Sequence, residues 1–296
     1  MQTAPSSLTA AEASGILAAT VVALIALWLL TWLALGGTWR LGRFGIERVR
    51  ELGVLDPLRA VRAQLSKSFP RSWAFIAARF TPGRPTGLLL TLIGGAALYL
   101  GLLFAGLIED VLEADEIVAT DRYITDLIAP GRHPILVHVF RWITELGSMP
   151  TLTAVAIVAT GFLWAHRQIH YIASVWLTIA GSQITTWSGK FLLQRQRPDF
   201  ILDVTAASPS FPSGHATGAT AVLGIIAYVI ARDLARPRAS FDIAFWTLVL
   251  ILLIAFSRIF LAVHYPSDVF AGLLVGGFWL LAGIALGEVL RTTGRA

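Results

Sequence analysis

Long apolar segments constrain the fold of this chain more than any other feature of its sequence. A helix rises about 1.5 Å per residue, so about 20 apolar residues cross the roughly 30 Å hydrocarbon core of a bilayer. Segments that approach this length run over residues 16–36, 87–108, 149–165, 169–189, 216–231, 243–263 and 269–287. The sequence therefore predicts an all-α, polytopic membrane helical bundle with about seven transmembrane helices.

Composition supports a membrane protein and excludes several chemistries. The 296 residues are 56% hydrophobic and only 14% charged, which is far from the balance of a soluble domain. The chain has no cysteine, so it forms no disulfide, has no thiolate nucleophile and cannot hold a Cys-ligated metal. A net charge of +5 could indicate nucleic acid binding, but the distribution of the arginines along the chain argues against that partner.

Basic residues gather in alternate loops between the apolar segments. Ten lie between Arg40 and Arg84, and the later ones of this set are Arg167, Arg232, Arg236, Arg238, Arg291 and Arg295. The complementary loops carry most of the acidic residues, including Glu109, Asp110, Asp121 and Asp126. Because basic loops stay in the cytoplasm, we expect the N-terminus outside and the C-terminus in the cytoplasm. The protein is then a multi-pass protein of the cell membrane.

The chain divides by composition into residues 1–86 and residues 87–296. The first part holds one apolar segment, which we interpret as a retained helix because it is too long for the core of a signal peptide. A basic amphipathic stretch follows between Arg40 and Pro85 and suits helices on the cytoplasmic membrane surface. The second part contains the other six segments and every motif described below.

The stretch KFLLQRQRP places two cations seven residues apart, at Lys190 and Arg197. On a continuous helix that spacing returns both side chains to one face, and Pro198 would end the helix. A charge inside a membrane segment costs about 2.5 to 3.5 kcal/mol. The guanidinium fork of arginine matches the oxygens of a phosphate, so the pair indicates an anion site, although snorkelling basic side chains would give a similar pattern.

The stretch PSGH has the form of a helix start. Pro212 and Ser213 are start residues, and Gly214 allows another group to approach the backbone closely. Helix N-termini bind anions through free N–H groups. His215 adds a group that titrates near neutral pH, which helix capping alone does not explain.

The stretch SRIFLAVHYPSD contains Ser257, Arg258, His264 and Asp268. We expect Ser257 and His264 to share one face of the sixth apolar helix. Because Pro266 interrupts the helix, Asp268 should approach from the start of the seventh helix after a tight turn. A carboxylate that binds one imidazole nitrogen leaves the other nitrogen directed as a nucleophile or base, although an interfacial histidine beside a helix-capping aspartate would look the same.

Together these three motifs, in this order, resemble the signature of the type 2 phosphatidic acid phosphatase superfamily, in its bacterial membrane-bound branch of lipid phosphate phosphatases. The resemblance spans about residues 87 to 290, where six helices would form the catalytic core. It implies that His264 is the nucleophile and forms a phosphohistidine, that Asp268 orients it, and that His215 is the general acid and base. It further implies phosphate binding by Lys190, Arg197, Ser213, Gly214 and Arg258, with no metal and no other cofactor.

The substrate is less constrained than the chemistry. A site at the outer ends of the helices reaches lipid headgroups of the outer leaflet, so we expect a membrane lipid phosphate as substrate. Undecaprenyl diphosphate is the first expectation for a bacterial chain, and phosphatidic acid, phosphatidylglycerol phosphate and lipid A phosphates remain alternatives. A phosphotransferase that uses the same phosphohistidine remains open, as does a non-enzymatic lipid transporter or scramblase, and the oligomeric state stays undefined.

Overall fold

The computed structural model describes residues 8–51, 56–81, 87–113, 115–198, 208–234 and 236–293, and these residues contain helices but no strands. The predicted all-α class is therefore confirmed. Contacts divide the chain into two units, residues 15–91 and the remainder. Each unit is described by itself.

The described residues of the first unit are mostly helical. Helix α1 (Ala10–Glu51) contains the apolar stretch Ala10–Gly36, which is long and apolar enough to cross a membrane, as predicted. Helices α2 (Asp56–Ser68) and α3 (Pro70–Arg79) occupy the predicted basic amphipathic stretch. Proline at the first position of α3 fits there because that position needs no N–H donor. Their location on a membrane surface stays a prediction.

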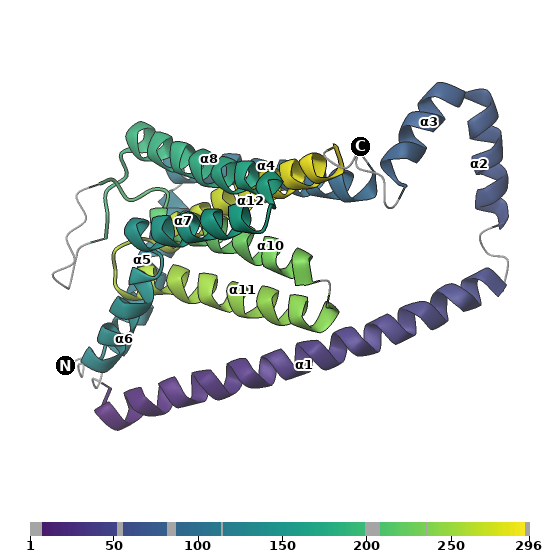
Figure 1. Cartoon of the computed structure of the whole chain (residues 1–296). Coiled ribbons are helices and arrows are strands. Elements are labelled where there is room, and N and C mark those ends of the chain that lie inside the picture. The colour runs from purple at the N-terminus through teal and green to yellow at the C-terminus, as the bar shows by residue number, and fades with distance from the viewer. Residues whose placement is uncertain are drawn as a thin grey trace. The chain divides into compact units, whose positions relative to one another are not determined.

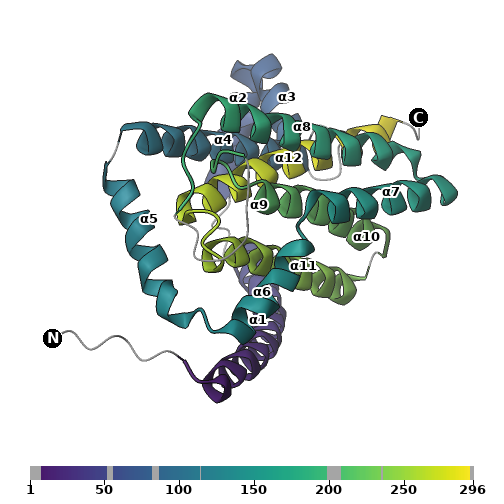
Figure 2. The ribbon, with the colours of Figure 1, turned by 90° about the vertical axis from the view of Figure 1, so that its left-hand side faces the viewer.

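The second unit is a bundle of helices with α12 at its centre (Figure 1). Helix α12 lies along α8, while α5 runs across the end of the bundle instead of along it (Figure 2). The helices are α4 (Leu88–Glu113), α5 (Asp115–Ile128), α6 (Pro134–Glu145), α7 (Met149–Ala165), α8 (Ile169–Leu193), α9 (Gly214–Gly218), α10 (Gly224–Leu234), α11 (Pro237–Phe260) and α12 (Pro266–Thr293).

Helices α9 and α10 form one continuous segment. A π-helical turn, η2 (Ala219–Leu223), joins them, so residues 214–234 read as a single helix with one wide turn in its first half. A π turn is one residue longer than an α turn and is common beside functional sites. The turn separates the PSGH end of the segment from the part packed in the core.

The count of about seven membrane spans is not reproduced. Five helices in the described part of the chain are long and apolar enough to cross a membrane, and a sixth span arises if α6 and α7, which meet at a 42° bend, act as one. The five are the predicted first, second, fifth, sixth and seventh spans, with ends that differ by a few residues. Helix α7 alone is too short to count as a membrane span, and α8 is long enough but not apolar enough.

Helix α8 is less apolar because one of its faces is polar. Residues Ser174, Thr178, Ser182, Thr186 and Lys190 follow one another at intervals of four, and all are buried. Spacing by four places them in one stripe. Three of the hydroxyls donate to carbonyls of their own helix, at Ser174, Ile179 and Ser182. The stripe lowers the hydropathy of α8, but the bundle covers it.

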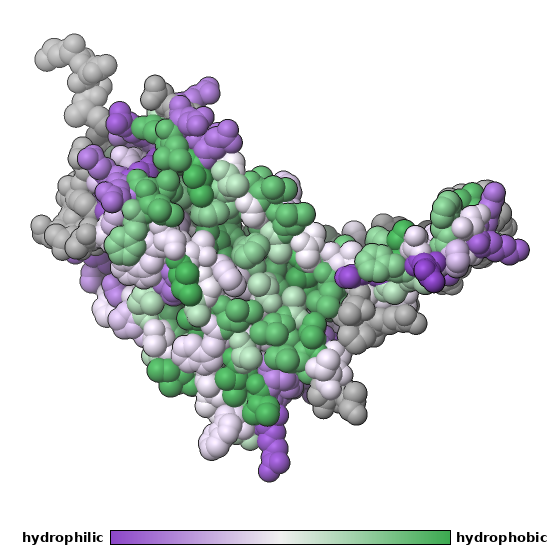
Figure 3. Space-filling view, turned by 90° about the horizontal axis from the view of Figure 1, so that it is seen from above, coloured by the Kyte–Doolittle hydropathy of each residue, from purple (hydrophilic) through white to green (hydrophobic). Residues whose placement is uncertain are grey.

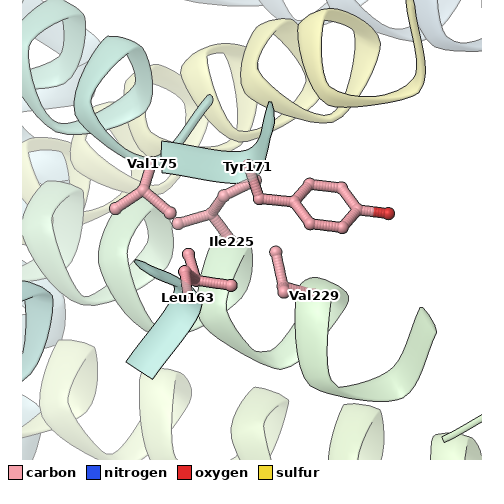
Figure 4. Close-up of a cluster of buried hydrophobic side chains, with 5 residues drawn as sticks. All are labelled: Leu163, Tyr171, Val175, Ile225 and Val229. Atoms are coloured by element: carbon pink, nitrogen blue, oxygen red, sulfur yellow. The ribbon is translucent and has the colours of Figure 1, made fainter. Parts of the chain in front are cut away.

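The buried apolar side chains connect neighbouring helices. Figure 4 shows one cluster that joins α7, α8 and α10, formed by Leu163, Tyr171, Val175, Ile225 and Val229. Outside the core, hydrophobic side chains cover much of the visible face, and hydrophilic side chains lie mostly toward its edges (Figure 3). An exposed apolar surface of this extent suits contact with lipid.

Glycines of α12 let the PSGH segment approach closely. A Cβ added to Gly272 would lie 2.7 Å from the carbonyl oxygen of Ser213, and one added to Gly276 would lie 2.7 Å from that of Thr217. Real Cβ atoms essentially never approach so near. The start of α9 therefore rests directly on the backbone of α12, which fixes the position of the second motif relative to the third.

Candidate active site

The three motifs meet at one end of the bundle. This end is formed by the end of α8, the start of α9, the end of α11 and the start of α12. Lys190, Arg197, Arg258 and His264 all lie close enough to His215 to interact with its charge. The backbone N–H of Ser213 also donates to the carbonyl of Asp268 at 2.9 Å, which links the second and third motifs directly. The predicted side chains are thus brought together.

Lys190 and Arg197 converge, but not along one helix as expected. Helix α8 ends at Leu193, and Gln194 turns the chain with a positive φ of 45°, so Arg197 lies beyond the helix. Lys190 Nζ donates to the carbonyl of Pro209 and, at 3.3 Å, to Ser208 Oγ. Arg197 donates to the Ser208 carbonyl at 2.8 Å and to Ser208 Oγ at 3.2 Å. A shared serine therefore holds the two cations together.

His264 lies outside α11, so the expectation that it shares a helix face with Ser257 is wrong. Helix α11 ends at Phe260, and Ala262 takes a positive φ of 52° before α12 begins at Pro266. Ser257 Oγ donates to the Ile254 carbonyl of its own helix at 2.6 Å. The prediction that Asp268 approaches from the start of the next helix is confirmed, since Asp268 lies in the first turn of α12.

The imidazole of His264 is held at both nitrogens. Nδ1 lies 3.5 Å from Asp268 Oδ2 and 3.3 Å from Ser210 Oγ, and Ser210 also donates to Asp268 Oδ2. Nε2 lies 3.1 Å from Arg197 Nη1, on the side of the cations. The carboxylate thus sits on the Nδ1 side, and the opposite nitrogen faces the cationic part of the site.

Burial keeps His264 neutral. It lowers the pKa of His264 to about 3, because the positive charges of Arg258 and Arg197 add to desolvation and outweigh the opposite effect of Asp268. Burial also lowers the pKa of the Arg197 guanidinium. A neutral imidazole retains the lone pair that a nucleophile or base needs at pH 7.

Two buried polar atoms at this end have no hydrogen-bond partner among the described residues. They are Ser213 Oγ and Arg258 Nε. Arg258 is 5% exposed and donates from Nη1 to Thr144 Oγ1 at 2.8 Å, while Ser213 is fully buried. Buried donors without partners are costly, so they indicate a place for a ligand that accepts hydrogen bonds.

Several residues of the site were missed by sequence reasoning. Arg195 donates to Asp268 Oδ1 at 2.6 Å and to Asp121 Oδ2 at 2.7 Å, and its guanidinium stacks 4.8 Å from the Tyr265 ring centroid. Burial alone would lower the pKa of Arg195, but the two carboxylates raise it. Arg195 lies inside the first motif and could have been noticed there, whereas nothing near Asp121 marks it.

The residues at this end resemble an anion site in their chemistry. In the described ranges, no three His, Asp or Glu side chains gather in a way that could hold a metal ion. Instead, Lys190, Arg197 and Arg258 combine with a helix start and a neutral histidine. Phosphate groups are bound by such sets of cations and backbone N–H groups. The fold is that of a multi-pass helical membrane protein, and the chemistry of the site suits an anion.

Comparison with known proteins identifies the family. The model of the PAP2 superfamily matches residues 171–289, which include all three motifs. Over these residues the chain matches the PAP2 superfamily, as its motifs predict.

Similar proteins include bacterial membrane enzymes. The chain is 27% identical over 178 residues to phosphatidylglycerophosphatase B of Bacillus subtilis, covering 59% of this chain and 86% of that protein. It is 41% identical over 91 residues to decaprenylphosphoryl-5-phosphoribose phosphatase of Mycobacterium tuberculosis, covering 29% of this chain and 45% of that protein. The crystal structure of a transmembrane PAP2 type phosphatidylglycerolphosphate phosphatase from Bacillus subtilis matches with a TM-score of 0.58 at 24% identity, over 67% of this chain and 96% of that one. That structure supports the fold.

Proposed function

We propose that this protein is an integral membrane lipid phosphate phosphatase that acts through a phosphohistidine at His264. The observation that carries the proposal is the set of buried donors without partners beside a neutral histidine. Ser213 Oγ and Arg258 Nε have no hydrogen-bond acceptor in the described structure, and His264 Nε2 faces the same cations. A phosphoryl group would supply the missing acceptors.

The proposed reaction has two steps. His264 Nε2 attacks phosphorus, the P–O bond to the lipid breaks, and protonated His215 gives its proton to the leaving oxygen. Water then attacks phosphorus, His215 takes a proton from that water, and the P–N bond breaks to release phosphate and free His264. Asp268 keeps the proton of His264 on Nδ1 during both steps.

The cations would stabilise the charge that develops during transfer. Phosphoryl transfer depends mainly on positioning and on stabilising charge at the equatorial oxygens. Lys190, Arg197 and Arg258 provide three positive charges, and Ser213 with the N–H of Gly214 provides neutral donors at the helix start. No step of this mechanism requires a metal.

The proposed topology places the site at the outer face of the membrane. The loops at the opposite ends of the same helices carry Arg167, Arg232, Arg236 and Arg291. Basic loops are retained in the cytoplasm, so the motif end faces outward. Helix α8 and the bent pair of α6 and α7 then complete the six-helix core over residues 87–296, with residues 1–86 as an N-terminal addition.

The proposed substrate is a lipid with a terminal phosphate or diphosphate, and undecaprenyl diphosphate is the first choice. The names of the similar proteins support this class, since one acts on a phosphatidylglycerophosphate and another on a decaprenylphosphoryl compound. A panel of undecaprenyl diphosphate, phosphatidylglycerol phosphate, phosphatidic acid and lipid A phosphate in detergent should rank them by phosphate released.

The test of the mechanism compares two histidine variants. His264→Ala should abolish phosphate release, whereas His166→Ala, an exposed histidine after α7, should leave it unchanged. Release by the parent protein should persist in EDTA and be inhibited by orthovanadate. Full activity of folded His264→Ala would contradict the phosphohistidine, and transfer of labelled phosphate to an acceptor lipid would indicate a phosphotransferase instead.

A further inference from the structure

Arg195 forms a network that the three motifs do not include. Its Nη1 donates to Asp268 Oδ1 at 2.6 Å and to Ser267 Oγ at 2.7 Å, and its Nη2 donates to Asp121 Oδ2 at 2.7 Å. The side chains of Arg195, Asp121 and Asp268 are 12%, 3% and 0% exposed. One guanidinium therefore joins two buried carboxylates with the planar fork geometry that only arginine offers.

Asp121 anchors this network to the first turn of α12. Its Oδ1 accepts the backbone N–H of Ser267 at 2.9 Å, and its Oδ2 accepts the Ser267 hydroxyl together with Arg195. Asp121 belongs to α5, Arg195 follows α8, and Ser267 opens α12. The network therefore ties three elements together directly beside Asp268.

Both carboxylate oxygens of Asp268 accept hydrogen bonds. Oδ1 is bound by Arg195, while Oδ2 accepts from Ser210 and from the backbone N–H of Tyr265 at 2.9 Å. The carboxylate cannot rotate without breaking these bonds. Its Oδ2 is thus held on the Nδ1 side of His264, at 3.5 Å.

Arg195 differs from the other cations of the site in its ion pairs. Arg195 has two carboxylate partners. Lys190, Arg197 and Arg258 have no ion pair within the residues that the structure describes. A guanidinium already paired with two carboxylates has little positive charge left for a phosphate, so Arg195 is suited to holding a neighbour in place.

We propose that Arg195, anchored by Asp121, is a positioning residue that fixes Asp268 and, through Asp268, the imidazole of His264. The inference rests on the proposed phosphatase function and extends it. Arg195 and Asp121 touch no reacting atom in this arrangement. Their loss therefore lowers the rate of the chemical step and leaves substrate binding nearly unchanged.

The first test measures kcat and KM for phosphate release by Asp121→Asn. We expect kcat to fall about 10- to 100-fold, the range found when an outer partner that holds a functional histidine is removed, with KM within about twofold of the parent. Asp126→Asn is the matched control, because Asp126 lies on the same helix but is exposed, and both constants should stay at parent values. An unchanged kcat in Asp121→Asn, or a loss confined to KM, would contradict the inference.

The second test asks whether Asp121 acts through Arg195. Arg195→Ala should lower kcat at least as much as Asp121→Asn, and adding Asp121→Asn to Arg195→Ala should cost no more than a further factor of about two. Losses that multiply would show two independent roles and overturn the proposal. If Arg195→Ala does not fold, Arg195→Lys replaces it, since one ammonium cannot bridge both carboxylates, and the same loss of kcat is expected.

Failure of the proposed phosphatase function and failure of the role proposed for Arg195 give different results. A folded parent protein that releases no phosphate from any lipid of the panel contradicts the proposed function and this inference together. An active parent whose Asp121 and Arg195 variants keep full kcat contradicts the inference alone.

Discussion

The two ends of the bundle differ in whether a buried charged side chain is paired with an opposite charge. At the end away from the motifs, Glu288 is 4% exposed and accepts from Tyr228, from Arg232 at 3.0 Å and from Arg291 at 2.7 Å. At the motif end, Lys190 and Arg258 are each 5% exposed and have no carboxylate partner in the described structure.

This difference fits a structural cluster at one end and the proposed binding site at the other. Buried ions that are paired can hold helices together, whereas buried cations that repel one another raise the free energy of the folded protein. A fold retains such a repulsive group when an anion neutralises it during function. The comparison therefore predicts that changes at one end cost stability and that changes at the other end cost activity.

The largest effect is expected for Arg258→Gln at the motif end. Loss of a cation directed at the transferred group should lower kcat by about 10²- to 10³-fold. The apparent melting temperature in detergent should rise, because one of three mutually repelling charges is removed. Arg141→Gln on the exposed face of α6 is the control and should change neither quantity. A large drop in melting temperature with a normal kcat would show that Arg258 serves stability and not activity, contrary to the role proposed for the motif end.

The opposite pattern is expected for Glu288→Gln. Removing the carboxylate leaves Arg232 and Arg291 unpaired and should cost about 2 kcal/mol of stability, less than for a fully buried pair because Arg232 is 45% exposed. The kcat of the folded protein should remain within about twofold of the parent. Thermal unfolding in detergent measures the first quantity, with Glu109→Gln on α4 as the exposed control. Selective loss of kcat would show that this end also serves the reaction.

A similar loss of stability, together with a loss of activity, is expected for Gly272→Ala. The new methyl would collide with the Ser213 carbonyl and push α9 away from α12, so stability should fall by about 1 to 3 kcal/mol. Activity should fall as well, because the displacement moves Ser213 and His215 relative to His264. Gly161→Ala in α7 meets open space and is the control. Equal melting temperatures for the two variants would argue against the close packing of α9 on α12.

The last prediction concerns the pH dependence of stability at the motif end. His264 has a pKa of about 3 in the folded protein, against about 6.5 when unfolded, so its unfolded form binds more protons between these values. Stability is therefore full above pH 6.5 and is lost as the pH falls toward 3. Between pH 7 and pH 5 the parent should lose about 2 kcal/mol more stability than His264→Gln. An equal pH dependence of the melting temperature for both proteins would show that folding does not lower the pKa of His264.

Sequence predicted the composition of the site better than its local structure. The motif residues meet as expected because each motif lies at an end of a helix, and helix ends follow from apolar length and proline. The expectation that Arg197 and His264 continue their helices was wrong. Gln194 and Ala262 turn the chain with positive φ. Neither is a glycine, the residue that usually marks such a turn in a sequence, so the turns could not be predicted.

Two features of the fold depend on tertiary packing that the sequence alone does not show. Asp121 lies near no motif, and only the fold brings α5 to the start of α12. Helix α8 read as a membrane span by its overall apolar character, although its buried stripe of serine and threonine lowers its hydropathy. Such a stripe is stabilised by neighbouring helices that a single sequence does not reveal.

The π turn between α9 and α10 has a consequence for how this chain can change in length. A π turn contains one residue more than the α turn it replaces. Deleting one of residues 219–223 would leave an α turn that still completes one rotation, so the first turn of the segment would keep nearly its direction relative to the residues that follow. A single codon lost from the regular helix α10 would instead rotate His215 by about 100° relative to the residues that follow the deletion. The π turn is therefore the one place in this segment where the chain can lose a residue and keep His215 directed toward His264.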